Sequence, residues 1–153
     1  MLRIQNLVVA MFVTSLALGA CATDQPSRVD ESAVQISSAG ELSTYLKATP
    51  HSPLDHLSAA GKQRFIDSLV FTPDGLASYR YSELEGLTAT EAHQILSLFG
   101  VERTTSMITK LRVTTGSDKA VMQARISEDH NDMWCSSPGT CSNDIGSICT
   151  SNC

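Results

Sequence analysis

Four of the five cysteines in this 153-residue chain lie within its last nineteen residues, and this clustering constrains the fold more than any other feature. The stretch CSSPGTCSNDIGSICTSNC, residues 135–153, has few large apolar side chains and is rich in serine, threonine and glycine. Such a segment has almost no apolar core to order it. Disulfide bonds would order it instead, each contributing on the order of 2 to 3 kcal/mol to the stability of the folded state.

The spacing of these cysteines separates three chemical possibilities. Cys135, Cys141, Cys149 and Cys153 are separated by five, seven and three residues, without the short C-x2-C pairs typical of structural zinc sites. The absence of C-x-x-C also argues against a redox motif with a lowered thiol pKa. The four cysteines of the tail are an even number, which is typical of disulfides in exported chains, and export is what the N-terminal residues predict. We therefore predict two disulfides and no metal site.

The disulfide pairing is less constrained, because four cysteines allow three pairings. Residues 137–140 place Pro and Gly at the centre of a type II turn, which would return Cys141 towards Cys135. Cys149 and Cys153 are four residues apart and would share one face of a helix. This favours Cys135 with Cys141 and Cys149 with Cys153, while a crossed or nested arrangement remains open.

The N-terminus is typical of an export signal. Arg3 is followed by an apolar run over residues 7–18, which is too short to span a bilayer comfortably. The sequence Leu18-Gly19-Ala20-Cys21 then resembles the lipobox of bacterial lipoproteins. The resemblance implies that residues 1–20 are removed and that Cys21 becomes the acylated first residue.

Assigning Cys21 to a lipid also explains the odd number of cysteines in an exported chain. Ala22, where lipoproteins retained in the inner membrane tend to have Asp, implies sorting to the outer membrane. Residues 21–40 are polar and predict a lipidated N-terminus on a flexible tether, with a root-mean-square span of roughly 25 Å.

The centre of the chain, residues 41–128, predicts a small, mainly α domain of about four short helices. The spacing of apolar residues indicates helices near residues 41–48, 59–71, 91–99 and 119–128. Thr88 with Glu91 forms a capping box, and Gly100 provides a C-terminal cap for the third of these helices. Residues 76–81 are compatible with either a short strand or an extended connector. Residues 129–153 are expected to form an irregular, disulfide-bonded tail.

The tail also contains the only tryptophan, Trp134, for which two positions remain open. It could pack on the cysteine cluster, or it could dock the tail onto the helical domain. Just before it, residues 129–132 (DHND) offer oxygen and imidazole groups to a divalent ion. The stretch lacks the spacing of a calcium loop, so a solvated acidic linker is the preferred interpretation.

No catalytic motif is present: the chain has no phosphate-binding glycine loop, no Gly-x-Ser-x-Gly and no His-Glu-x-x-His. The histidines, His51, His56, His93 and His130, show no spacing that selects a site. We therefore predict a protein without catalytic residues or a cofactor.

The net charge of −5 argues against nucleic acid as a partner. The expected function is a non-enzymatic, lipid-anchored envelope protein with a structural or interaction role and an unidentified protein partner. It would lie at the periplasmic face of the outer membrane. The alternative is a precursor that releases its tail as a small cysteine-rich, bacteriocin-like peptide.

Overall fold

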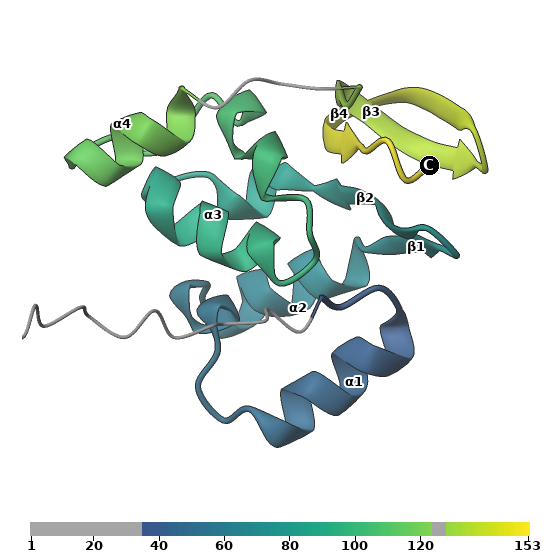
Figure 1. Ribbon diagram of the computed structural model, residues 1–153, viewed down its shortest axis with the longest axis horizontal. Helices are drawn as coiled ribbons and strands as arrows, with labels where there is room; N and C mark the ends of the chain where they lie inside the picture. Colours follow the sequence, from purple (N-terminus) through teal and green to yellow (C-terminus); the bar gives the residue numbers. More distant parts are fainter. Residues whose placement is uncertain (1–34, 124–127) are drawn as a thin grey trace, which may run out of the picture. The chain divides into compact units, whose positions relative to one another are not determined.

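A four-stranded antiparallel sheet accompanies the helices, so the prediction of a mainly α fold is wrong. The structure is a computed structural model and describes residues 35–123 and 128–153 (Figure 1). The strands lie in the order β1-β2-β4-β3, and their bounds are β1 Val70–Thr72, β2 Gly75–Arg80, β3 His130–Ser137 and β4 Thr140–Cys149.

The helices in the described residues are short. The α-helices are α1 Ala39–Ala48, α2 Ala59–Asp67, α3 Ala89–Ser97 and α4 Gly116–Met122. Three 3-10 helices, η1 Pro53–His56, η2 Tyr81–Leu84 and η3 Glu102–Met107, connect them. All helices precede β3 in the chain, so the sheet is completed by its C-terminal hairpin.

The C-terminal segment is regular, contrary to the expectation of an irregular tail. It forms the β3–β4 hairpin, and β4 pairs with β2 as well as with β3. A half-buried strand normally shows alternating apolar and polar residues. In β3 both faces are largely polar and exposed, and Cys135 is its one buried residue. The pattern that would reveal a strand is therefore missing from this part of the sequence.

The prediction for α3 is confirmed in detail. Thr88 Oγ1 accepts from Glu91 N, and Thr88 N donates to the Glu91 carboxylate at 2.8 Å, which completes the capping box. Gly100 follows with a positive φ of 67°, and a Cβ there would collide with the side chain of Gln35. Gly100 is thus required both for its backbone conformation and for the close approach of the N-terminal segment.

Helix α2 ends earlier than the sequence predicts. Ser68 follows the helix, and its hydroxyl donates to Phe65 O at 2.7 Å and accepts from Arg80 N at 3.0 Å. The chain then enters β1, so Val70 and Phe71 lie in a strand rather than on a helix face. Residues 72–75, Thr-Pro-Asp-Gly, join β1 to β2, and residues 76–81 prove to be mainly a strand.

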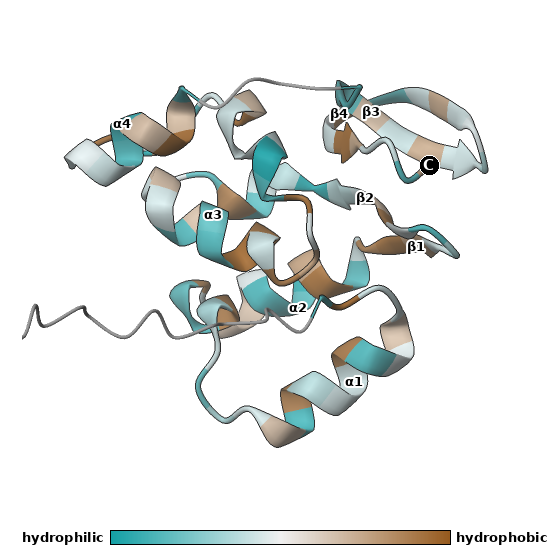
Figure 2. Ribbon diagram, in the orientation of Figure 1, coloured by the Kyte–Doolittle hydropathy of each residue, from teal (hydrophilic) through white to brown (hydrophobic). Residues whose placement is uncertain are grey.

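The main hydrophobic core joins the helices to β2. Phe65 contacts Tyr79 and Phe99 edge to face, with ring centroids 6.0 and 6.2 Å apart. Ile36 is fully buried, and its amide donates to Leu98 O at 2.7 Å, so the packed region includes residues that the sequence assigns to the tether. Hydrophobic colours concentrate on α2, α3 and β1, whereas much of the β3–β4 hairpin is pale or hydrophilic (Figure 2).

Asp118 fastens α4 to the start of α3. Its buried carboxylate accepts from Thr90 N and Oγ1 at 3.0 and 2.6 Å. It also accepts from the amides of Thr114 and Thr115, both at 2.9 Å. These donors, led by the Thr90 hydroxyl, hold the pKa of Asp118 well below its usual range, because they favour the charged carboxylate. Helix α4 begins at Gly116, before the predicted start at residue 119, and residues 124–127 lie outside the described part.

Candidate functional site: a disulfide-bonded hairpin

The β3–β4 hairpin contains two nested disulfides, Cys135–Cys153 and Cys141–Cys149. The prediction that the tail cysteines form disulfides is confirmed, but the favoured pairing is wrong and the nested arrangement is the one formed. Cys135 and Cys141 do lie opposite each other in the hairpin, as the turn predicts. Each nevertheless bonds to a different partner, because Cys149 ends a strand rather than lying in a helix beside Cys153.

A bulge of four residues in β4 explains this pairing. Asn131 faces Ile148 and Met133 faces Asn143, so residues 144–147 of β4 stand opposite Asp132 alone. The extra residues fold the strand back on itself, which brings the Cα atoms of Cys141 and Cys149 to 6.0 Å. A bulge of this kind bends a strand locally and depends on the tertiary structure around it.

Asp132 organises the bulge. It has a positive φ of 56°, and its Oδ1 accepts from Gly146 N at 3.0 Å and from the Tyr81 hydroxyl at 2.7 Å. The Gly146 amide and then the Tyr81 hydroxyl lower the pKa of Asp132. The same carboxylate, together with partial burial, raises the pKa of Tyr81 to about 12. A hydroxyl from η2 is thereby fixed to the C-terminal hairpin.

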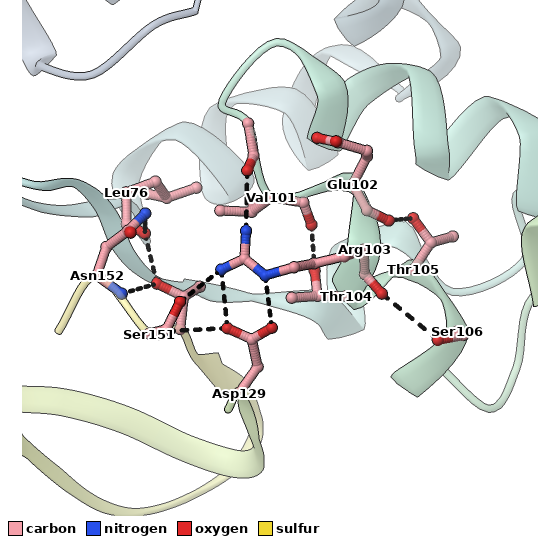
Figure 3. Close-up of polar contacts among 12 residues, drawn as sticks. Leu76, Val101, Glu102, Arg103, Thr104, Thr105, Ser106, Asp129, Ser151 and Asn152 are labelled. Atoms are coloured by element: carbon pink, nitrogen blue, oxygen red, sulfur yellow. Dashed lines mark hydrogen bonds and ion pairs between the residues drawn. The ribbon is translucent and has the colours of Figure 1, made fainter. Parts of the chain in front are cut away.

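A second polar contact joins the beginning of β3 to η3, as Figure 3 shows. The guanidinium of Arg103 donates to both carboxylate oxygens of Asp129, at 2.9 and 3.0 Å. It also donates to Gly100 O at 3.0 Å and to Ser151 Oγ at 2.8 Å, while Ser151 N donates to Asp129 at 2.8 Å. The Asp129 side chain is fully buried. This bidentate pair therefore ties the helical part to both ends of the hairpin.

The C-terminal residues are fastened to the edge of β2. Thr150 donates through its amide to Ala77 O and through its hydroxyl to Leu76 O, at 2.8 and 2.7 Å. Gly139 N, in the hairpin turn, donates to Cys153 O at 2.5 Å. The last residue is thus held in place by hydrogen bonds as well as by its disulfide.

The hydrophobic cluster under the hairpin is small. It contains the buried residues Ala77, Cys135 and Cys149, with partly buried Met133, Cys141 and Cys153 against it. Trp134 is 42% exposed and belongs to neither hydrophobic cluster of the described residues, so neither position considered for it is supported. Ile145, in the bulge, is 89% exposed.

The side chains of the acidic stretch at residues 129–132 do not converge to form a cation site. Asp129 is paired with Arg103, Asp132 binds Tyr81 and Gly146, and His130 is exposed. Within residues 35–123 and 128–153, the one group with metal-ligand geometry is Cys141, Cys149 and Cys153, whose sulfurs are engaged in disulfides.

The remaining candidate residues are dispersed. His93 is partly buried on α3, with Nδ1 3.3 Å from Ser97 Oγ, and His56 Nδ1 lies 3.6 Å from the carboxylate of Glu91. Cys21, the predicted lipidation site, lies outside the described residues. The sequence does not reveal Arg103, because an ion pair across 26 residues leaves no periodic signal.

No protein family, curated protein or solved structure matches this chain. Across the part of the chain that the structure describes, no helix is long and apolar enough to cross a membrane.

Proposed function

We propose that this chain is a lipid-anchored protein of the bacterial cell envelope, in which the folded domain presents its disulfide-bonded hairpin to a protein partner. The anchor is the acylated Cys21, and the domain lies at the periplasmic face of the outer membrane. The role is one of interaction or structure rather than catalysis. Export also supplies the oxidising compartment in which structural disulfides persist.

The observation that carries the proposal is the integration of the cysteine-rich segment into the sheet. Strand β4 lies between β2 and β3, with Tyr79 opposite Ile148 and Ser78 opposite Cys149. Ile148 and Cys149 are fully buried. The segment is therefore part of the folded domain rather than an appendage awaiting release.

This arrangement argues against a peptide precursor. Cleavage near Trp134 would cut β3 in its middle and would separate β4 from β2. The released peptide would expose Ile148, and the remaining domain would lose one side of its sheet. Each product would then carry unpaired strand edges, which favour aggregation.

The surface proposed for the partner is the outer part of the hairpin, which we define by Trp134 and Ile145. Both are large apolar side chains with substantial exposure, 42% and 89%. Tryptophan is enriched at the energetic centres of protein interfaces. In contrast, the net charge of −5 gives no support for binding to nucleic acid or to anionic lipid headgroups.

Intact-mass measurement of the protein isolated from bacterial membranes tests the anchor and the tail together. We expect an acylated N-terminus at Cys21 on a chain that extends to Cys153 and is lighter by four hydrogens. A Cys21→Ser variant is expected to leave the membrane fraction while keeping both disulfides. A free peptide beginning near Trp134 would support the precursor function instead.

The partner surface is tested by site-specific photo-crosslinking in intact cells. A crosslinker at Ile145 is expected to give a discrete protein adduct. The matched control is Val113, which is 45% exposed and lies outside the hairpin. Equal adducts from both positions, or none from Ile145, would contradict the proposed surface.

A further inference from the structure

The two disulfides of the hairpin are close enough to react with each other. The sulfur atoms of Cys141, Cys149 and Cys153 all lie within 4.8 Å of one another. Cys153 belongs to one disulfide, and the other two cysteines form the second. A thiolate formed at Cys153 would therefore have a disulfide beside it without any rearrangement of the backbone.

We propose that the four cysteines form a two-step thiol–disulfide exchange site for an external dithiol, in which opening of Cys135–Cys153 is followed by internal attack on Cys141–Cys149. The substrate class is a dithiol, either a small molecule or a reduced protein of the envelope. This activity goes beyond an anchored structural role, and it does not depend on lipidation.

Within the Cys135–Cys153 disulfide, exposure selects Cys153 as the sulfur that an external dithiol attacks. Cys135 is 4% exposed and Cys149 is fully buried, whereas Cys153 and Cys141 are partly exposed, so each disulfide has one accessible sulfur. One thiolate of the dithiol attacks Cys153 Sγ, forms a mixed disulfide and releases the Cys135 thiolate. The second thiol then attacks the sulfur of its own mixed disulfide and releases the Cys153 thiolate. The dithiol is oxidised to a disulfide, and its two protons pass to the released thiolates or to water.

The second step is internal and redox-neutral. The Cys153 thiolate attacks Sγ of Cys141 or Cys149, forms one new disulfide and releases the other cysteine as a thiolate. The chain end remains in place after the first bond opens, because Gly139 N donates to Cys153 O and Cys153 N donates to Thr150 O. The Cys153 sulfur also lies 3.4 and 3.5 Å from the carbonyl oxygens of Ser137 and Thr140.

The register of the hairpin places the two thiols that the exchange leaves free opposite each other. Attack at Cys149 forms Cys149–Cys153 and releases Cys141, which lies opposite the free Cys135. Reoxidation of those two thiols would give a second arrangement of the same four cysteines. Reduction thus begins at Cys153, and after the internal exchange the two free thiols are those of Cys135 and Cys141.

Limited reduction with alkylation mapping tests the exchange. The full folded chain is treated with substoichiometric dithiothreitol, quenched with acid, alkylated and digested. We expect species with two alkylated cysteines that include Cys135 with Cys141 or Cys149, besides Cys135 with Cys153. If Cys135 and Cys153 are the sole labelled pair, with Cys141–Cys149 intact, internal exchange does not occur.

A variant without the internal nucleophile gives the kinetic control. An intramolecular thiol acts at an effective concentration of about millimolar or more. Cys135→Ala leaves Cys153 as a free thiol beside Cys141–Cys149, so with the dithiol at about 0.1 mM this disulfide is expected to open faster, by about tenfold or more, in Cys135→Ala than in Cys135→Ala/Cys153→Ala. Equal rates would overturn the proposal. Should this variant unfold, the mapping experiment on the natural sequence decides alone.

Discussion

The helical core and the C-terminal hairpin are stabilised in different ways. The helical core, defined here by the cluster around Phe65, Ile95 and Phe99, buries large apolar side chains from the helices and from β2. The hairpin, β3 with β4 and residues 150–153, contributes Ile148 to that core and otherwise packs on a small cluster of Cys135 and Cys149 with Ala77 of β2. Two disulfides within nineteen residues supply the constraint that apolar burial does not.

The difference shows how a short chain divides its stability between two mechanisms. Burial of apolar surface stabilises the folded state wherever the sequence supplies large side chains. A disulfide acts mainly by restricting the unfolded chain, so it stabilises a polar segment equally well. Truncation of an aromatic residue should therefore damage the helical core, and loss of a disulfide should damage the hairpin.

The largest expected effect comes from Phe65→Ala. Phe65 is fully buried and packs edge to face on Tyr79 and Phe99, so its truncation leaves a cavity beside both rings. We expect a loss of about 3 to 5 kcal/mol in the free energy of unfolding, measured by urea denaturation. Val113→Ala, at a 45% exposed position, is the control and should change it by less than about 0.5 kcal/mol. Similar losses for both variants would contradict the assignment of the core.

The next largest effect is expected from Cys141→Ala/Cys149→Ala. Removing a disulfide with a sequence separation of 8 costs about 2.5 kcal/mol by the chain-entropy estimate. Hydrogen exchange should show the loss in the amides of β3 and of residues 140–146, while the amides of α3 keep their protection. Uniform loss of protection in both regions would show that the hairpin and the helical core unfold as one unit.

The two regions also differ in how far the sequence predicts them. Helix α3 is predicted because its determinants are local: Thr88 and Glu91 lie three residues apart, and Gly100 directly follows the last turn. The strands of the hairpin are not predicted, because their exposed polar residues do not alternate with apolar ones. The hairpin is stabilised by its disulfides, which require no alternation of apolar and polar residues, so the sequence carries no strand pattern there.

The candidate site was predictable in its chemistry but not in its geometry. The clustering of cysteines predicts disulfides, whereas the pairing depends on the bulge at residues 144–147. That bulge in turn depends on Asp132 and on Tyr81, which is 51 residues away in the chain. Interactions across such distances leave no trace in local spacing.

The contact between the two regions is tested by Arg103→Met. The substitution keeps an extended side chain but removes the charged donors to Asp129, Gly100 and Ser151. We expect the free energy of unfolding to fall by about 2 to 3 kcal/mol, because hydrogen bonds to a buried carboxylate are lost. Lys110→Met removes an exposed pair with Glu85 and should cost less than about 1 kcal/mol. Equal costs would mean that the Arg103 pair does not hold the hairpin to η3.

The smallest expected effect is a shift in acid sensitivity within the helical part. The Thr90 hydroxyl is the leading cause of the lowered pKa of Asp118. Because that pKa is lower in the folded state, Asp118 contributes stability above its unfolded pKa of about 3.9. The contribution is lost as the pH falls through the folded pKa, since the unfolded chain binds the proton more readily.

Thr90→Val removes this hydroxyl donor, while the Thr90 amide still donates to Asp118. The folded pKa of Asp118 should rise towards its usual value, so the midpoint of acid unfolding should move to higher pH, with a small loss of stability at pH 7. Circular dichroism of pH titrations measures this midpoint. Thr44→Val is the matched control, because the Thr44 hydroxyl donates to the backbone carbonyl of Gly40. If both variants unfold at the same pH, the Thr90 hydroxyl does not determine the acid sensitivity attributed to Asp118.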